Sequence, residues 1–283
     1  THVSSRSPLD SYVILTKQSS IAVHASSPSQ NDQLTPKKRA DLERYLDATR
    51  SSLLYAKRVL LVEGPAEQFL IPPLVRRVMG DEYDLERLGI SVISIYGVHF
   101  DVYIRLFGKD AMRKKCAVVA DGDMKSSDAE EPQDVEEPPD PAGDVDTPDA
   151  PNIPDTLDLP DPLAIEDLQG PYVRVFKNKT TFERDLTLHG TLMMFAKAAE
   201  ELGAPRNARA MQTGYGDVYV ASLNGNDEDA ILEQLGIKVL ATAKRFGKAR
   251  FAQVASKYVH LASELPDYIK DAINWLCQDG VDG

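Results

Sequence analysis

The sequence contains few cysteines, with only Cys116 and Cys277 among its 283 residues. They lie far apart, and neither belongs to a CxxC pair or has a histidine at zinc-ligand spacing. This scarcity argues against a disulfide framework and against a structural zinc site. It favours a reducing compartment, and we expect a cytoplasmic protein.

The sequence also lacks an apolar run of about 18 residues, the length that a membrane-spanning helix needs. It begins at Thr1, without a Met and without the charged and apolar regions of a signal peptide. We therefore expect no membrane partner, and we expect the chain to be a fragment of a longer protein. Its apolar content of 42% predicts a globular chain with a buried core.

Positive charge is scarce, since 32 basic residues face 44 acidic ones and the net charge is −12. This balance opposes a nucleic-acid partner, because phosphate contacts depend on Lys and Arg. However, residues 124–170 carry 15 of the acids, 9 of the 18 prolines and one base, Lys125. The other residues hold 31 bases against 29 acids. We predict a nearly neutral globule with one acidic, solvated and partly flexible insertion; the alternative is an insertion that mimics nucleic-acid charge.

Apolar periodicity predicts the order of the elements. Residues 1–34 form a lead-in with two strand-like runs, and residues 35–56 form one long amphipathic helix that starts at Thr35-Pro36. Buried-strand patterns then alternate with helix patterns, with strands expected at 59–62, 90–95, 116–120 and 172–176 and helices at 66–79 and 100–107. This alternation predicts an α/β fold, a mainly parallel sheet flanked by helices.

The remaining sequence, residues 191–283, has helical patterns almost throughout and predicts an added helical subdomain. The helices are expected at 192–202, 228–235, 239–246, 251–258 and 268–276.

Acidic residues follow three of the predicted strands. Because active sites in open α/β sheets collect at the carboxyl ends of the strands, we expect these acids to lie together. They cannot all stay ionised at close range without a cation. Oxygen ligands without His or Cys suit Mg²⁺ or Mn²⁺, and two such ions can promote phosphodiester hydrolysis. Gly122, between two of the acids, is expected to leave space for an ion. The six acids are Glu63, Glu67, Asp121, Asp123, Glu183 and Asp185.

Three segments carry a family resemblance: LLVEGPAE, VVADGD and TTFERDL, in this order with strands between them. Together they resemble the Toprim fold, a Rossmann-like fold that topoisomerases, bacterial primases and nucleases of the overcoming-lysogenization-defect (OLD) family share. Other stretches resemble OLD nucleases in particular, of the class 2 type: SLLYAKRVLLVEGPAEQFLIPPL, ISVISIYGVHFDVYIRLFG, GKARFAQ and LPDYIKDAINWL. The resemblance covers most of residues 35–278, apart from the acidic insertion.

The resemblance implies a DNA endonuclease whose Toprim domain spans residues 57–190 and uses Mg²⁺ or Mn²⁺, with two ions per site. It assigns metal binding to all six acids, and catalytic roles to Glu63 and Asp121 among them. Lys248, within GKARFAQ, matches the family's lysine, which is expected to position the scissile phosphate or stabilise its developing charge. Because this lysine lies in the helical half, that half is expected to fold back over the strand ends.

The resemblance also implies an ABC-type ATPase ahead of the Toprim region. This sequence has no GxxxxGK[ST] loop, but its opening THVSS resembles the histidine switch near the end of such ATPases. We therefore expect residues 1–34 to be the tail end of that ATPase domain. The expected partners are DNA and the chain's own ATPase domain, and a homodimer is a further possible assembly.

Two other functions compete with the nuclease. A non-catalytic Toprim module that binds DNA or a protein is the chief alternative, and the full acid set argues against it. A primase-type polymerase would need a nucleotide site and a zinc domain, neither of which is visible. Tyr96 and Tyr103 could suggest a topoisomerase nucleophile, but both lie in apolar patterns and are expected to pack. His99 and His189 are expected to be structural rather than general bases.

Overall fold

The computed structural model describes residues 7–17, 21–28, 34–46, 50–96, 100–122, 165–225 and 227–278. The predicted acidic insertion lies outside the described residues as far as residue 164, and so does His99. Within the described ranges, no helix combines the length and the apolar character that crossing a membrane requires.

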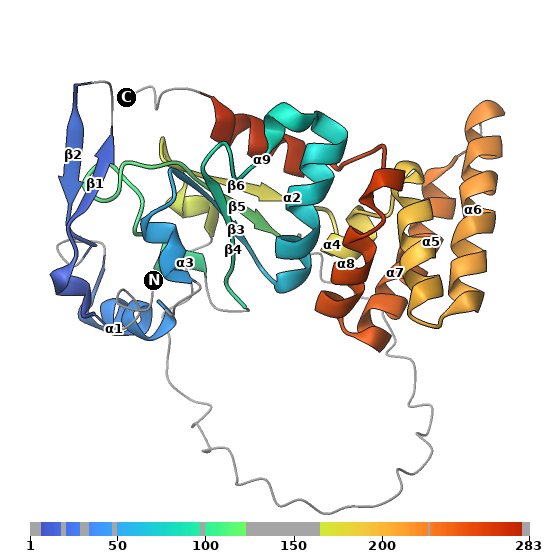
Figure 1. The fold of residues 1–283 in the computed structure, drawn as a ribbon, viewed down its shortest axis with the longest axis horizontal. Coiled ribbons are helices and arrows are strands. Elements are labelled where there is room, and N and C mark those ends of the chain that lie inside the picture. Colours follow the sequence, from blue (N-terminus) through green and yellow to red (C-terminus); the bar gives the residue numbers. More distant parts are fainter. Residues whose placement is uncertain are drawn as a thin grey trace, which may run out of the picture.

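Four parallel strands form the central sheet in the order β4-β3-β5-β6 (Figure 1). The two central strands have the sequences RVLLV and CAVVA, and nearly all of their residues are buried. Continuous apolar runs of this kind are typical of strands covered on both faces. The predicted α/β fold class, with a mainly parallel Toprim-like sheet, is therefore confirmed. The strands are β3 (Arg58–Val62), β4 (Ile90–Ser94), β5 (Cys116–Ala120) and β6 (Val173–Lys177).

Alternate residues of the strands point into two different apolar clusters, because successive side chains of a strand face opposite sides. Leu60 and Val62 belong to a cluster that includes α2 (Pro65–Met79) and α9 (Asp267–Cys277). Val59 and Leu61 belong to the other, which includes α1 (Pro36–Tyr45) and α3 (Phe100–Ile104). The sheet is thus the middle layer between two helical layers.

Helices dominate after the short α4 (Phe182–Asp185) and gather beside the sheet, where the arrowheads of β5 and β6 point toward α4 (Figure 1). Met194, Phe251 and Trp275 share the apolar cluster of Leu60, so one continuous core joins these helices to the sheet. The helices are α5 (Leu192–Glu201), α6 (Pro205–Leu223), α7 (Asp229–Phe246) and α8 (Lys248–Ser256).

Short elements complete the fold. The two strand-like runs of the lead-in pair as an antiparallel hairpin, β1 (Ile14–Lys17) and β2 (Val23–Ser26). The 3₁₀ helices are η2 (Leu9–Ser11), η4 (Arg50–Leu54), η5 (Asp81–Tyr83), η6 (Ile165–Leu168), η7 (His189–Thr191) and η8 (Val259–Leu261).

Three helix predictions were wrong in extent. The helix predicted over 35–56 starts as expected, with the Thr35 hydroxyl accepting from the N–H of Lys38, but α1 ends at Tyr45 because Leu46 leaves helical geometry with ψ 64°. The predicted break within 228–246 does not exist: α7 continues through Gly236, which is buried together with Leu235 and Val239 on the packed side of the helix. Helix α3 is shorter than the predicted 100–107.

Helix α6 was not predicted at all. Its sequence contains Gly214 and Gly216, which normally weaken a helix prediction. A Cβ on Gly214 would lie 2.5 Å from a side-chain atom of Leu235, so the glycine permits close packing of α6 on α7. Tertiary contacts therefore outweigh the poor helix propensity.

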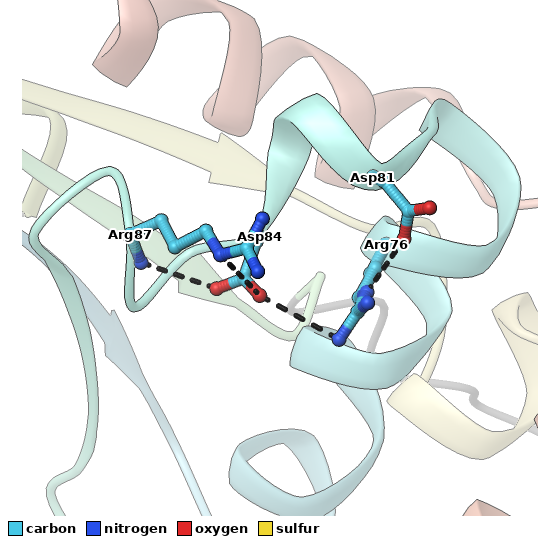
Figure 2. Close-up of polar contacts among 4 residues, drawn as sticks. All are labelled: Arg76, Asp81, Asp84 and Arg87. Atoms are coloured by element: carbon cyan, nitrogen blue, oxygen red, sulfur yellow. Dashed lines mark hydrogen bonds and ion pairs between the residues drawn. The ribbon is translucent and has the colours of Figure 1, made fainter.

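Ion pairs surround the turn that follows α2 (Figure 2). Arg76 Nε lies 2.8 Å from Asp81 Oδ1, and Arg76 Nη1 lies 3.6 Å from Asp84 Oδ2. Arg87 contributes a second contact to Asp84, with its Nε at 3.9 Å. Exposed pairs of this kind add little stability one by one, but together they connect the end of α2 to η5 and the approach to β4.

Candidate metal and catalytic site

Glu63 and Glu67 lie where β3 passes into α2. Glu63 follows the last residue of β3, and its Oε1 accepts a hydrogen bond of 2.7 Å from the N–H of Asp121, at the end of β5. Gly64 caps α2, and Glu67 lies in the first turn of that helix with only 7% of its surface exposed. Two adjacent strand ends are thus joined directly through a carboxylate.

Asn178, which directly follows β6, holds Asp121 and Gly122 in place by hydrogen bonds. Its Nδ2 donates to Asp121 Oδ1 at 2.5 Å, and its Oδ1 accepts from the N–H of Gly122 at 2.6 Å. A Cβ on Gly122 would lie only 2.5 Å from the carbonyl oxygen of Asn178. The space that we expected for an ion at Gly122 is therefore taken by neighbouring backbone.

Asn178 was absent from the predicted site residues. It follows β6 at the same sheet edge as the acids, so the strand-end rule that selected them could also have selected this amide.

Glu183 and Lys248 meet at this same edge. Glu183, on α4, is 4% exposed, and its Oε2 accepts from Lys248 Nζ at 3.0 Å. Its other oxygen, Oε1, is buried and has no hydrogen-bond partner. Lys248 is the first residue of α8, and Gly247 before it has φ 85°, a left-handed conformation that favours glycine. This turn between α7 and α8 returns Lys248 to α4.

Asp185 forms hydrogen bonds with the connection between β6 and α4. Its carboxylate accepts from the backbone N–H of Lys179, from the N–H of Thr180 at 3.2 Å and from the Thr180 hydroxyl at 2.5 Å. These contacts tie α4 to the connection from β6, so Asp185 is more fully engaged than the other predicted ligands. The sixth predicted acid, Asp123, lies outside the described residues.

The remaining carboxylates influence one another strongly. Burial, together with the negative charges of Asp121, Glu183 and Glu63, raises the pKa of Glu67 to about 8. Burial also raises the pKa of Asp121 to about 6, with Glu63 and Glu183 adding to the rise. We call Glu63, Glu67, Asp121 and Glu183 the acid cluster.

Lys248 is the cation beside the acid cluster. Burial lowers the pKa of its ammonium group, but the charge and hydrogen bond of Glu183, with smaller contributions from Asp121 and Glu67, outweigh burial and raise it. The lysine is therefore held in its charged form.

The chemistry of the acid cluster fits a hard divalent cation. The donors are all oxygens, the pKa values of two of them are raised by burial and by neighbouring negative charge, and Glu183 Oε1 is a buried acceptor without a donor. However, among the residues that the structure describes, no three Asp, Glu, His or Cys side chains form a ready-made metal-binding group.

Comparison with known families agrees with this geometry. Residues 54–123 match the family model described as "Overcoming lysogenization defect protein-like, TOPRIM domain". The OLD resemblance inferred from the sequence is thus confirmed for the segment that runs through β3, α2 and β4 to the end of β5. This OLD-like TOPRIM segment contains Glu63, Glu67 and Asp121, whereas Glu183 and Lys248 lie beyond the matched residues.

Solved structures of OLD proteins show a weaker likeness. The C-terminal region of the Burkholderia pseudomallei OLD protein is 22% identical, covers 78% of this chain and 96% of its own, and has a TM-score of 0.48. A C-terminal region of the Xanthomonas campestris pv. campestris OLD protein is 24% identical, covers 79% and 95%, and has a TM-score of 0.47. Comparison with curated proteins found no match. The OLD-like assignment therefore depends on the family model.

The aromatic candidates have different environments. Tyr103 is fully buried, as expected, whereas Tyr96 is 52% exposed and has φ 53°, so the packing expected for Tyr96 was wrong. It ends the apolar run of β4 just where the strand leaves the sheet.

The ring of His189 stacks on Tyr215, with 4.2 Å between the ring centroids, and Nε2 lies 3.2 Å from the Tyr215 carbonyl oxygen. This contact is consistent with a structural histidine.

Proposed function

We propose that this protein is a metal-dependent endodeoxyribonuclease that hydrolyses DNA phosphodiester bonds by a two-metal Toprim mechanism. The observation that carries the proposal is the acid cluster at the strand ends with Lys248 beside it, within and next to an OLD-like TOPRIM segment. Mg²⁺ or Mn²⁺ is the proposed cofactor. The proposed ligands are Glu63, Glu67, Asp121, Asp123, Glu183 and Asp185.

The bound cations would supply an activated water and a counter-charge for the leaving oxygen. The chain's own residues do the rest. Asn178 fixes Asp121 and the backbone of Gly122, so the carboxylate at the end of β5 keeps one orientation. Lys248 stays protonated and, from α8, can hold a phosphate oxygen by charge and hydrogen bonding. Its contact with Glu183 keeps the ammonium group at the cluster before the substrate arrives.

A basic surface beside the cluster supports DNA as the substrate. Residues 235–262 contain no acid, and their six bases are Lys238, Lys244, Arg245, Lys248, Arg250 and Lys257. We call Lys244, Arg245 and Arg250, which are all exposed, the α7–α8 corner. Unlike Lys248, these three form no ion pair with any residue that the structure describes. Unpaired cations next to a phosphoryl-transfer site suit a polyanionic substrate.

Plasmid cleavage tests the proposal. Supercoiled DNA is incubated with the protein and Mg²⁺ or Mn²⁺, and we expect nicked or linear product that EDTA abolishes. Asp121→Asn and Glu183→Gln keep side-chain size but remove a charge, and each should lower the rate by about 100-fold or more. Glu86→Gln, at an exposed acid ahead of the first residue of β4, should cut like the parent. Undiminished cutting by both cluster variants would exclude the mechanism.

One observation favours a second candidate, a non-catalytic Toprim module that binds DNA or a protein. In the described part of the chain the acids do not converge into a three-ligand group. Under this alternative the parent would bind DNA and leave the plasmid intact at every cation concentration.

The chain's wider organisation is also part of the proposal. We propose that residues 1–34 end an upstream ATPase domain, that residues 35–56 lead into the Toprim domain over 57–190, and that residues 191–283 form its helical subdomain. The ATPase domain is then a partner within the full-length protein, and a homodimer is a further proposed assembly.

A further inference from the structure

Helix α6 presents an apolar face to solvent. The helix lies at one end of the molecule and packs on α5 and α7 with its inner side (Figure 1). Near the end of the helix, Tyr219 and Val220 are each 55% exposed, and Leu223 is 69% exposed. Single exposed apolar residues are ordinary, but several that gather on one face mark an interaction surface.

The exposed residues follow the spacing of a helix-packing seam. They recur at alternating intervals of four and three residues, so they lie along one line of the helix. On the opposite side, Met211, Gly214 and Val218 are buried. A stripe with this spacing is the kind of surface on which another helix packs. We call the following five exposed residues the α6 stripe: Arg209, Thr213, Gly216, Val220 and Leu223.

Gly216, at the middle of the α6 stripe, has no packing role within the described part of the chain. A Cβ added to it would meet no described atom within 4 Å, whereas a Cβ on Gly214 would lie 2.5 Å from Leu235. Glycine weakens a helix relative to alanine, so a glycine in a helix usually serves a close approach. At Gly216 that approach can come only from outside, by the backbone of a second helix.

The two ends of the face carry opposite charge. Arg206 and Arg209 lie near the start of α6, and neither forms an ion pair with a described residue. In contrast, residues 210–237 hold five acids and no base. Two of these acids, Asp227 and Asp229, are exposed where the chain passes from α6 into α7. An antiparallel copy of α6 would place each basic end on an acidic end, whereas a parallel copy would oppose like charges.

An antiparallel pair centred on Gly216 also matches the apolar residues. Arg209 then meets Leu223 of the partner subunit, because the two are equally far from the centre, and its methylene stem covers the leucine while its charge stays in water. The 19 residues of α6 make a helix about 28 Å long. One helix pair of this length is small among stable interfaces, so the association should be reversible and depend on concentration.

We propose that the α6 stripe is the surface on which a second copy of this chain docks, with the two α6 helices antiparallel about a two-fold axis at Gly216. A two-fold contact of this type uses the same patch on both copies, and the α6 face is complementary to itself in charge. The inference rests on the homodimer of the proposed organisation, but it depends neither on cation binding nor on DNA cleavage.

Sedimentation velocity of the full chain over a range of concentrations tests the proposal. Val220→Glu places a charge in the seam, and we expect the Kd of self-association to rise by about 10-fold or more. The matched control is Ile237→Glu, at a residue of α7 that is also 55% exposed, and its Kd should equal that of the parent. Gly216→Gln should likewise weaken the dimer, while the melting temperature of the dilute chain should not fall, because glutamine favours the helix more than glycine does.

A charge exchange tests the antiparallel arrangement. The double variant Arg206→Glu with Arg209→Glu should raise the Kd by about 10-fold or more, because both ends of the face are then acidic. Adding Asp227→Arg and Asp229→Arg to the same chain should restore association, since opposite charges meet again. A variant that is merely misfolded would not be rescued in this way.

A parent chain that stays monomeric up to about 1 mM overturns the proposal. It is also overturned if Val220→Glu leaves the Kd unchanged, or if the charge exchange fails to restore association. Plasmid cleavage is read separately. A monomeric parent that cuts DNA removes the docking surface and leaves the nuclease in place, whereas a parent that dimerises through α6 without cutting contradicts only the nuclease.

Discussion

Lys114 is a buried lysine that should make stability depend on pH. It is 6% exposed, its ammonium group donates to the carbonyl of Leu54 at 2.8 Å, and burial lowers its pKa to about 8. Below pH 8 the lysine is charged in both states, and the folded state bears the cost of burying that charge. Between pH 8 and the unfolded value of 10.5 the folded chain loses the proton first, so the contribution of this group to stability rises with pH.

Lys114→Met should therefore raise the free energy of unfolding at pH 7 by about 1 kcal/mol, because removing the charge outweighs the loss of the hydrogen bond to Leu54. The advantage should shrink as pH rises from about 8 and should disappear above pH 10.5, where the parent lysine becomes neutral in both states. Urea unfolding at several pH values measures the difference in stability between Lys114→Met and the parent. Lys109→Met, at an exposed lysine on the same connection, should show no such trend. A Lys114→Met advantage that grows with pH would contradict the argument.

Single residues also show how far sequence reasoning reaches. The placement of Glu63 and Asp121 at adjacent strand ends follows from the rule that parallel strands share a carboxyl edge, and the structure joins the two through a hydrogen bond. The hydrogen bonds of Asn178 to Asp121 and Gly122 depend on which residues meet in three dimensions. Periodicity carries no information about such contacts between distant segments.

At the scale of elements, strands were easier to predict than helices. Short apolar runs indicate buried strands such as β3 and β5, whereas α6 includes Gly214, which allows it to pack closely on Leu235 of α7. In a sequence, a glycine favours the prediction that a helix ends there. Only the packing of a neighbouring helix shows that the helix continues.

The corner where α7 meets α8 should contact DNA phosphates. A variant in which Lys244, Arg245 and Arg250 are all replaced by Gln should bind DNA with a weaker salt dependence. The slope of log affinity against log salt should become less negative by about 0.9 for each phosphate contact that is lost. A labelled duplex in Ca²⁺, followed by fluorescence anisotropy between about 50 mM and 200 mM salt, measures the slope. The control neutralises three exposed lysines outside the α7–α8 corner: Lys17, Lys57 and Lys109. Equal slopes for the two triple variants would exclude a specific contact at this corner.

At the scale of the whole molecule, the predicted boundary after residue 190 separates elements that share one core. Leu60 on the sheet, Phe195 on α5 and Ile273 on α9 belong to the same buried cluster. Helix α9 returns to cover β5 and β6 although it follows every other described helix in the sequence. A change from strand-rich to helix-rich patterns therefore marks a change in element type, while continuity of the core depends on tertiary packing that sequence does not reveal.

A chain that ends at residue 190 should consequently fail to fold. Without α9 the sheet face that carries Leu60 and Val62 loses the fully buried Ile273 and Leu276, and without α8 it loses the buried Phe251. Losing one such side chain costs about 2 to 5 kcal/mol, so losing these three removes about as much free energy as the whole stability of a typical domain, about 5 to 15 kcal/mol. Circular dichroism should show no cooperative melt for this chain, whereas a chain ending at residue 278 should melt like the parent. A cooperative transition in the shorter chain would instead establish residues up to 190 as an independent domain.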